Sequence, residues 1–321
     1  MATYLCADLG GTNANLSLVK FDTSAKIIAK KEAKTQNITD ICSYICLFLS
    51  ENKDNPEHAC FSVAGTINNH SGKQFARLTN SSLAIDSRAI VKNTSLKTLT
   101  LINDFEAIGY ATNIIKNKDI MILNKGRPQY KGCRAVIGAG TGLGKNILYF
   151  DKTSKVYTPL PSEGGHAMFP INNQEEFKLI EFIKKKKKRN CFVEIEDIVS
   201  GHGLELIYEF YAKSYKNAPG KMASKEIASA KNSCAKKAFE MFLKFYARTA
   251  KNFCLETLAT GGLYIAGGIA AKNHEKFGQK FLQEFLSHDR FSKILNQIPV
   301  KIIKNYDISH LGAAFIARLK D

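Results

Sequence analysis

Three short glycine-rich turns, each directly after an apolar stretch, constrain this chain more than any other feature. They are DLGGTN at Asp8–Asn13, GAGTGLG at Gly138–Gly144 and IAGGI at Ile265–Ile269. Glycine lets the backbone approach an anion closely and point its N–H groups at phosphate oxygens, and Thr12 and Thr141 add hydroxyl donors. One such turn alone is typical of an ordinary structural turn. Three of them in one chain favour a nucleotide pocket.

Two common nucleotide-binding motifs do not fit these turns. A P-loop requires Ser or Thr after its Gly-Lys pair, whereas Asn146 follows Lys145, and Ala139 stands where the first glycine is required. The dinucleotide fingerprint fails because Leu143 occupies the place of the third glycine and the next segment has a strand pattern. The chain is therefore predicted to be neither a P-loop ATPase nor a Rossmann dehydrogenase.

The apolar periodicity predicts two α/β units with the same order of elements. In the first unit we expect strands at 4–10, 15–21, 26–34, 59–65 and 97–102, helices at 38–51 and from 103 onward, and a loop at 69–83. In the second unit we expect strands at 133–140, 145–151, 155–160 and 300–305, and a further strand that begins at 263 and enters a glycine turn. The segment 175–259 is expected to be mainly helical, with one long or kinked helical region at 228–259. A closing helix is expected at 310–320. The repeated order of strand, Gly-Thr turn, strand and strand suggests a duplicated domain.

The chain is long enough for two lobes. It has 321 residues, 45% of them hydrophobic, and no linker rich in Pro, Gly or Ser separates the two patterns. The change of pattern places a smaller α/β lobe at 1–105 plus about 305–321 and a larger α/β lobe at 106–304.

Composition indicates where the protein is expected to act and in which state its cysteines are. No run of eighteen apolar residues and no signal-peptide pattern is present, so we expect a cytoplasmic protein without a membrane partner. The eight cysteines form no CxxC pair or ligand cluster, which predicts reduced thiols and no structural zinc.

The net charge of +17 raises the question of nucleic acid. The cations are mostly Lys spread along the chain, with only eight Arg, and no recognition motif accompanies them, so we predict no nucleic-acid partner and keep it as a minor alternative. The run Lys184–Arg189 is interpreted as a solvated helix end, with a localisation signal or a phosphate-binding patch as alternatives.

Seven motifs in order carry a specific resemblance. They are ADLGGTN, LINDFEAIGY, GAGTGLG, PSEGGHAMF, EDIVSGHGLELIYEFY, IAGGIA and HLGAAF, and they extend over nearly the whole chain. The set resembles the bacterial-type glucokinase family of the hexokinase/actin-like superfamily. The resemblance implies an α/β, two-lobed actin-like ATPase fold of the ribonuclease H-like type, with duplicated mixed sheets flanked by helices, ATP and sugar in the cleft between the lobes, and a homodimer.

The resemblance also implies which residues bind ATP and Mg²⁺. The first two turns would contact phosphates and the third would line the adenosine: Asp8, Gly10, Gly11, Thr12, Asn13, Gly140, Thr141, Gly142, Gly267 and Gly268. Asp8 would hold Mg²⁺ through water, because this ion keeps most of its waters and takes few protein carboxylates. The competing interpretation of Asp8 is a cap on the first turn.

Asp104 is the predicted catalytic base. A sugar hydroxyl is a poor nucleophile, so a carboxylate has to accept its proton as the γ-phosphoryl group transfers. Taken alone, Asp104 would be an N-cap at the start of the next helix, and the match at INDFEA favours the catalytic role.

Sugar hydroxyls need short polar side chains that bind them in pairs. The resemblance assigns this role to Asn80, Asn103, Asp104, Glu163, His166 and Glu196. As isolated residues, His166 and Glu196 would be ordinary surface or helix-terminal groups.

The predicted function is ATP-dependent phosphorylation of glucose to glucose 6-phosphate. Three alternatives stay open: a kinase for another hexose, a catalytically silent sugar- or nucleotide-binding regulator, and an actin-like filament or chaperone-like ATPase. ADP or polyphosphate as the phosphoryl donor also stays open.

Overall fold

Buried apolar side chains form separate cores, and the chain divides accordingly into two units. The computed structural model describes residues 2–22, 24–70, 72–78, 81, 83–214 and 220–321. Unit 1 comprises Met1–Lys116, Asp151–Pro159 and Asp307–Asp321, and unit 2 comprises Asn117–Phe150 and Leu160–Tyr306. The boundaries expected from the sequence remain a proposal. By contacts, the helix that follows Asn103 belongs to unit 1, together with Asp151–Pro159.

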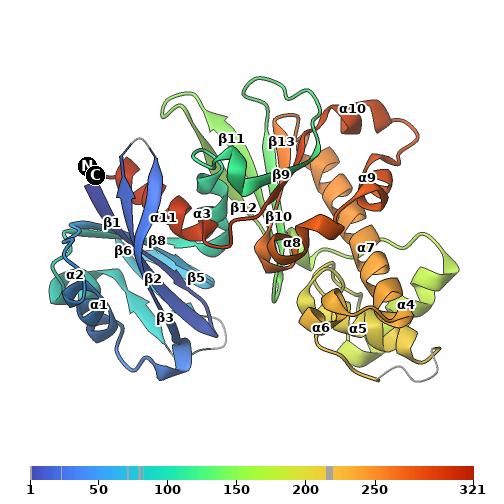
Figure 1. Cartoon of the computed structure of the whole chain (residues 1–321), viewed down its shortest axis with the longest axis horizontal. Coiled ribbons are helices and arrows are strands. Elements are labelled where there is room, and N and C mark those ends of the chain that lie inside the picture. Colours follow the sequence, from blue (N-terminus) through green and yellow to red (C-terminus); the bar gives the residue numbers. More distant parts are fainter. Residues whose placement is uncertain (1, 23, 71, 79–80, 82, 215–219) are drawn as a thin grey trace. The chain divides into compact units, whose positions relative to one another are not determined.

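Unit 1 is built on a mixed sheet of five strands (Figure 1). Its described strands are β1 (Ala2–Leu9), β2 (Asn13–Phe21), β3 (Ala25–Lys34), β4 (His58–Val63), β5 (Gly65–His70), β6 (Lys73–Leu78), β7 (Ala84–Asp86) and β8 (Thr98–Asn103). Its described α-helices are α1 (Ile41–Ser50), α2 (Ser87–Asn93), α3 (Asp104–Ala111) and α11 (Ile308–Leu319). The order in the main sheet is β3-β2-β1-β4-β8, antiparallel from β3 to β1 and parallel from β1 to β8.

Both faces of this sheet are covered, which explains why the four consecutive residues Tyr4–Ala7 of β1 are all buried. Successive side chains of a strand point to opposite faces. Leu5 and Leu9 join the core that contains α1 and α2, whereas Tyr4 and Cys6 join the core that contains α3 and α11. A strand buried on both faces reads as a continuous apolar run.

The prediction of a loop at 69–83 is wrong for much of this segment. β5, β6 and β7 form a separate three-stranded antiparallel sheet in that region. Only Ala76 and Leu78 of β6 are buried, and β5 has no buried side chain. An exposed, polar hairpin gives no apolar alternation from which a strand could be predicted.

Unit 2 contains a six-stranded mixed sheet and most of the helices of the chain (Figure 1). The strands of this sheet are β9 (Ile120–Asn124), β10 (Arg134–Ala139), β11 (Leu143–Asp151), β12 (Val156–Ser162), β13 (Gly262–Ala266) and β14 (Val300–Ile303). By contacts, the end of β11 and most of β12 are grouped with unit 1, in Asp151–Pro159. The described α-helices of unit 2 are α4 (Gln174–Lys187), α5 (Gly201–Ala212), α6 (Ser224–Ser229), α7 (Ser233–Thr257), α8 (Gly267–Asn273), α9 (Gln279–Leu286) and α10 (Ser292–Gln297). α7 is the longest of these and contacts β10, α5 and α9.

The two sheets repeat one strand order. The second sheet runs β12-β11-β10-β13-β14-β9, so each unit has an antiparallel hairpin next to two strands that run parallel to its first strand. The repeated arrangement agrees with the duplication suggested by the two Gly-Thr turns.

Two helical details differ from expectation. The region expected as one long or kinked helix at 228–259 is helical but interrupted. It consists of the end of α6 and of α7, because the chain leaves the helix at Ala230 and Asn232 caps α7 by accepting from Ala235 N. The glycines after β13 do not form a free turn. α8 begins directly at Gly267, whose φ of +85° is a conformation that glycine adopts without strain.

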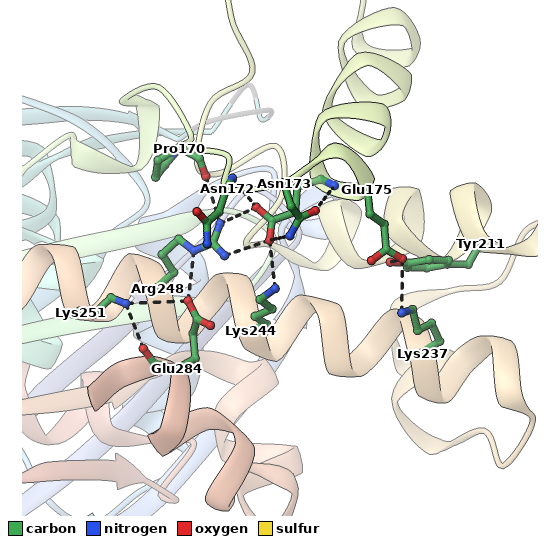
Figure 2. A network of polar contacts seen from close by, with 11 residues as sticks. Pro170, Asn172, Asn173, Glu175, Tyr211, Lys237, Lys244, Arg248, Lys251 and Glu284 are labelled. Atoms are coloured by element: carbon green, nitrogen blue, oxygen red, sulfur yellow. Dashed lines mark hydrogen bonds and ion pairs between the residues drawn. The ribbon is translucent and has the colours of Figure 1, made fainter. Parts of the chain in front are cut away.

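A buried ion network joins three helices of unit 2 (Figure 2). Arg248 of α7 donates to both carboxylate oxygens of Glu176 in α4, at 2.7 and 3.0 Å, and to Glu284 of α9 at 3.2 Å. Lys244 adds a further bond to Glu176 at 3.1 Å. Glu176 is completely buried, so hydrogen bonds from Arg248 and Lys244 replace the hydrogen bonds that water would make to its carboxylate.

Within the described ranges, no helix is both long and apolar enough to cross a membrane.

Candidate active site

In unit 1, two predicted carboxylates lie at the carboxyl ends of parallel strands. Asp8 is the penultimate residue of β1, and Asp104 follows β8 at the first position of α3. Only β4 separates β1 from β8 in the sheet. The carboxyl ends of parallel strands meet at one edge of a sheet, which is where open α/β sheets bind ligands.

Asp104 is held at the start of α3 without being its cap. The capping residue is Asn103, whose Oδ1 accepts from Phe105 N at 2.9 Å and from Glu106 N at 3.4 Å, while Glu106 accepts from Asn103 N in return. This capping box satisfies the helix end. Asp104 Oδ1 accepts from Phe105 N at 2.9 Å, and the Asn103 side chain also donates to this carboxylate. The N-cap of α3 is therefore Asn103 and not Asp104.

The surroundings of Asp104 favour the protonated form of its carboxyl. Burial and the negative charge of Asp8 raise its pKa to about 6, against the lowering effect of hydrogen bonds from the Phe105 N–H and the Asn103 side chain. A carboxylate with a pKa near neutrality is well matched to accept and return a proton at physiological pH.

Two hydroxyl groups lie beside the Asp8 carboxylate. Ser309 Oγ donates to Oδ2 at 3.0 Å and Ser62 Oγ lies 3.3 Å from Oδ1. Ser62 Oγ donates at a shorter distance, 2.9 Å, to Ala7 O, so Ser309 is the main hydroxyl donor to Asp8. Both carboxylate oxygens therefore keep acceptor capacity, which fits an ion that retains its waters. In the part of the chain that the structure describes, no group of three or more His, Cys, Asp or Glu side chains is placed to hold a metal by itself.

The first glycine turn is tied down through its carbonyl groups. Gly10 N donates to Asn13 O at 2.9 Å, and Thr35 donates through Oγ1 to Gly10 O at 2.7 Å and through N to Thr12 O at 3.1 Å. Among the described residues, no hydrogen-bond partner is found for the N–H groups of Gly11 and Thr12. These N–H groups are therefore available to an anion such as phosphate.

The second turn has the same property in unit 2. Gly140 N donates to Gly142 O at 2.8 Å, and Gly140 O accepts from Gly201 N at 2.8 Å. For Thr141 N and Gly142 N, no partner is found in the described ranges. An added Cβ at Gly140 would meet nothing within 4 Å, so space adjoins this turn.

The third glycine pair packs beside the second turn. A Cβ on Gly267 would lie 2.6 Å from Ala139 O, at the end of the strand that leads into Gly140. A Cβ on Gly268 would lie 3.3 Å from the ring of Tyr306. The close approach of Gly267 to β10 brings the two predicted glycine segments of unit 2 together.

The predicted sugar residues of unit 2 form one connected cluster. Glu163 precedes the 3₁₀ turn Gly164–His166, and His166 Nε2 lies 3.8 Å from Glu163 Oε2. Glu196 donates through its N to Gly165 O at 2.9 Å and accepts from Leu143 N at 2.8 Å through Oε2. Glu196 therefore links the Gly164–His166 turn to Leu143 of the second glycine turn.

Asn80 lies outside the described residues, so its predicted role is not addressed by the structure.

Two charged residues at or beside this cluster were missed by sequence reasoning: Glu194, which contacts His166, and Lys145, whose Nζ would lie 3.3 Å from a Cβ on Gly164. Glu194 Oε2 lies 2.9 Å from His166 Nδ1, and 28 positions separate the two residues in the sequence. Lys145 is buried, and its Nζ lies 5.2 Å from the centroid of the Phe253 ring. Burial lowers the pKa of this lysine. The pattern of neither residue in the sequence distinguishes it from an ordinary surface charge.

The basic run is anchored and not simply solvated. Arg189 binds both carboxylate oxygens of Asp197 at 2.8 and 2.9 Å, and Lys187 lies 3.3 Å from Asp197 Oδ1. Asp197 is buried and belongs to the segment that carries Glu194 and Glu196. The end of the run therefore holds the segment that contains a predicted sugar ligand.

Comparison with known proteins agrees with this arrangement. The sequence profile described as Glucokinase matches residues 5–320. A glucokinase of Nostoc sp. is 32% identical over 346 aligned residues that cover 99% of each chain. The crystal structure of a glucokinase from an Antarctic psychrotroph superimposes with a TM-score of 0.85 at 25% identity, with 99% of each chain covered. That of the Balamuthia mandrillaris enzyme superimposes with a TM-score of 0.82 at 23% identity, covering 99% of this chain and 94% of that one.

These similarities extend over the whole chain and include both units. The fold is the two-lobed α/β fold of the actin-like ATPases, with mixed sheets flanked by helices. With a profile match over nearly all of its length, the chain belongs to the glucokinase family.

Proposed function

We propose that this protein transfers the γ-phosphoryl group of ATP to the 6-hydroxyl of glucose. The observation that carries the proposal is the Asp104 carboxyl at the start of α3, with a pKa raised to about 6 by burial and by Asp8. Such a group accepts the proton of the attacking hydroxyl and is the part of a kinase that a mere sugar-binding protein does not need. The glucokinases similar to this chain support glucose as the acceptor.

In this proposal each unit supplies one share of the substrate contacts. Asn103 and Asp104 of unit 1, and Glu163, His166 and Glu196 of unit 2, bind the sugar hydroxyls. Asn103 Oδ1 is engaged by the capping box, so the side chain offers its amide N–H₂ group. Asn80 remains proposed as a sixth sugar residue.

The free N–H groups of the two Gly-Thr turns would bind the phosphates of ATP, and Gly267 and Gly268 would line its adenosine. Asp8 would hold Mg²⁺ through water, and the ion would neutralise charge that develops on the phosphates. During transfer the bond from the sugar O6 to phosphorus forms as the bond from phosphorus to the leaving ADP oxygen breaks. The O6 proton moves to Asp104.

Two further properties are part of the proposal. The protein is expected to act in the cytoplasm, since its eight cysteines are free thiols. It is expected to form a homodimer, which sedimentation velocity at micromolar concentration checks directly.

The deciding experiment measures sugar phosphate and ADP formation with MgATP for the wild type and for Asp104→Asn. Glucose should be preferred over mannose, fructose and N-acetylglucosamine. Loss of the base should lower kcat by about 10²- to 10⁴-fold, while calorimetry should still detect glucose binding. Asp86→Asn, which removes an exposed cap carboxylate on α2, is the matched control and should leave kcat unchanged.

Preference for another of the four sugars would replace glucose as the substrate. Turnover with ADP or polyphosphate in place of ATP would replace the donor. A wild type that binds glucose and phosphorylates no sugar would contradict the kinase assignment.

A further inference from the structure

The His166 ring is held on one side by a carboxylate that the proposed sugar site does not use. Glu194 Oε2 lies 2.9 Å from His166 Nδ1. The opposite ring nitrogen, Nε2, lies 3.8 Å from Glu163 Oε2, beyond hydrogen-bond distance. One ring nitrogen therefore has a fixed partner, and the other has none at hydrogen-bond distance in the described part of the chain.

The backbone on both sides of this contact is hydrogen-bonded together. Ile195 N donates to Ala167 O at 2.9 Å, Glu196 N donates to Gly165 O at 2.9 Å, and an antiparallel bridge pairs Met168 with Glu194. The segment of Glu194 and the loop of His166 therefore form a short two-stranded ladder. Such pairing fixes the distance between the two side chains more precisely than two independent loops would.

Arg189 fixes the other oxygen of Glu194. Its Nη1 lies 2.9 Å from Glu194 Oε1, and the remainder of the guanidinium group binds Asp197. Asp197 in turn accepts from Glu194 N at 3.0 Å. Only 18% of the Glu194 side chain is exposed, compared with 53% of His166. The carboxylate is thus the rigid partner, and the imidazole is the exposed one.

We propose that Glu194 is a positioning residue for sugar binding. Its carboxylate accepts the Nδ1–H of His166, which fixes the ring orientation and presents Nε2 to a sugar hydroxyl. A histidine that binds a ligand through one nitrogen is commonly oriented by the partner of the other. The inference rests on the proposed function, in which His166 contacts the sugar.

The charges around the ring also influence its protonation. The Glu194 hydrogen bond is the main cause of a raised pKa for His166, opposed by partial burial and supported by the charges of Glu196, Glu194 and Glu163. Arg189, behind Glu194, is the cation of this group. Removal of the Glu194 carboxylate should therefore move the His166 titration to lower pH.

The test compares Glu194→Ala, Glu194→Gln, His166→Gln and the double variant Glu194→Ala/His166→Gln. Glu194→Ala should raise the KM for glucose about tenfold or more and change kcat much less. The variant loses the charged acceptor that orients His166, and with it the hydrogen bond that His166 makes to the sugar. Glu194→Gln should recover much of the affinity, since its amide oxygen also accepts from Nδ1–H. The double variant should be no worse than His166→Gln alone, because Glu194 acts through His166.

Glu209→Ala is the matched control. The side chain of Glu209, in α5, is also 18% exposed, and it pairs with Lys186 near the C-terminal end of α4. Glu209 makes no contact with His166. It should leave the KM for glucose unchanged. An equal rise in KM for Glu209→Ala, full additivity in the double variant, or an effect of Glu194→Ala confined to kcat would show that Glu194 has only a structural role.

A second measurement does not depend on turnover. Nitrogen-15 spectra of the imidazole groups, with His166 assigned by its absence in His166→Gln, report the pKa and the tautomer directly. In Glu194→Ala the His166 titration should move to lower pH, and in Glu209→Ala it should not move. An unchanged His166 titration in Glu194→Ala overturns the inference, even if the wild type proves to phosphorylate no sugar and the proposed function fails.

Discussion

Asp8 and Asp104 illustrate how single residues depend on each other in this protein. Each carboxylate is held by hydroxyl or amide donors, yet the negative charge of Asp8 still raises the pKa of Asp104. Two neighbouring carboxyl groups can take different chemical roles when their surroundings favour different protonation states. In the proposed reaction, Asp104 would take part in proton transfer and Asp8 would hold a cation through water.

This pair predicts the pH dependence of the reaction. Asp104 must be ionised to accept a proton, and its pKa is about 6. The kcat/KM for glucose reports the free enzyme and should therefore fall about tenfold per pH unit well below pH 6. Asp8→Asn removes a charge that disfavours ionisation, so its acidic limb should move to lower pH even though its activity is reduced. A limb that stays in place would show that Asp8 does not act on Asp104.

Gly142 shows how little space separates the second turn from Glu196, a proposed sugar residue. A Cβ at this position would lie 2.5 Å from Glu196 Oε2, the atom that accepts from Leu143 N. Gly142→Ala should displace the Glu196 carboxylate and raise the KM for glucose roughly tenfold, the effect of about one lost charge-assisted hydrogen bond.

The neighbouring glycine is the comparison for this variant. A Cβ at Gly140 meets nothing within 4 Å, so Gly140→Ala should raise the KM for glucose less than Gly142→Ala does. Glucose titration calorimetry on both variants checks this, and equal effects would mean that the contact with Glu196 is unimportant.

Among the elements, α4, α7 and α9 are joined by the buried network of Figure 2. Burial alone would raise the pKa of Glu176, but hydrogen bonds from Arg248 and Lys244 lower it to about 2, from an ordinary value of 4.5. Glu176→Gln leaves Arg248 buried without its main counter-ion and should reduce the free energy of unfolding by about 3–5 kcal/mol. Urea unfolding followed by circular dichroism measures this change.

The adjacent residue is the control. Glu175 pairs with Lys237 at 3.3 Å and is 46% exposed, so Glu175→Gln should change the free energy of unfolding by less than about 1 kcal/mol. Because the Glu176 pKa is lowered in the folded state, its contribution is complete above pH 4.5 and is lost as the pH falls toward 2. The difference between wild type and Glu176→Gln should shrink over that range. A difference independent of pH would rule out the ion pair as its cause.

The contact between α3 and α11 depends on one glycine. A Cβ on Gly312 would lie 1.8 Å from Ala107 O, so the helices could not keep their separation. Gly312→Ala should lower the free energy of unfolding by about 1–3 kcal/mol through overpacking, although alanine favours a helix by about 1 kcal/mol. Gly220→Ala, where a Cβ meets nothing within 4 Å, should be nearly neutral in the same urea experiment. A stabilised Gly312→Ala would contradict the close packing.

At the scale of the whole molecule, the net charge of +17 opposes folding through self-repulsion. Salt screens this repulsion over about 10 Å at 0.1 M. The midpoint of thermal unfolding should therefore rise between about 10 and 150 mM NaCl, as measured by calorimetry. A midpoint that falls instead would mean that favourable surface ion pairs outweigh the repulsion.

The sequence predicted the features that local pattern controls. The strands before the first two glycine turns, and the helix that starts after Asn103, are where periodicity and capping residues place them. β6 was missed because its buried residues are only Ala76 and Leu78. Glu194 was missed because its role depends on a contact with His166 that only the tertiary structure creates. The predicted glycine turn after β13 is instead the start of a helix, since the backbone at Gly267 packs against Ala139.

The order of segments in unit 1 has a consequence for how the protein is made. α11 covers one face of the sheet, and its neighbour Asp321 accepts from Tyr4 Oη at 2.9 Å. At about 5–20 residues per second, a ribosome needs roughly 10–40 s to synthesise the roughly 200 residues between α3 and α11. During that time α3 can cover only part of the face that carries Tyr4 and Cys6, because the rest of that core comes from α11. Unit 1 can therefore complete this core only after α11 has been synthesised, although most of its sheet is made first.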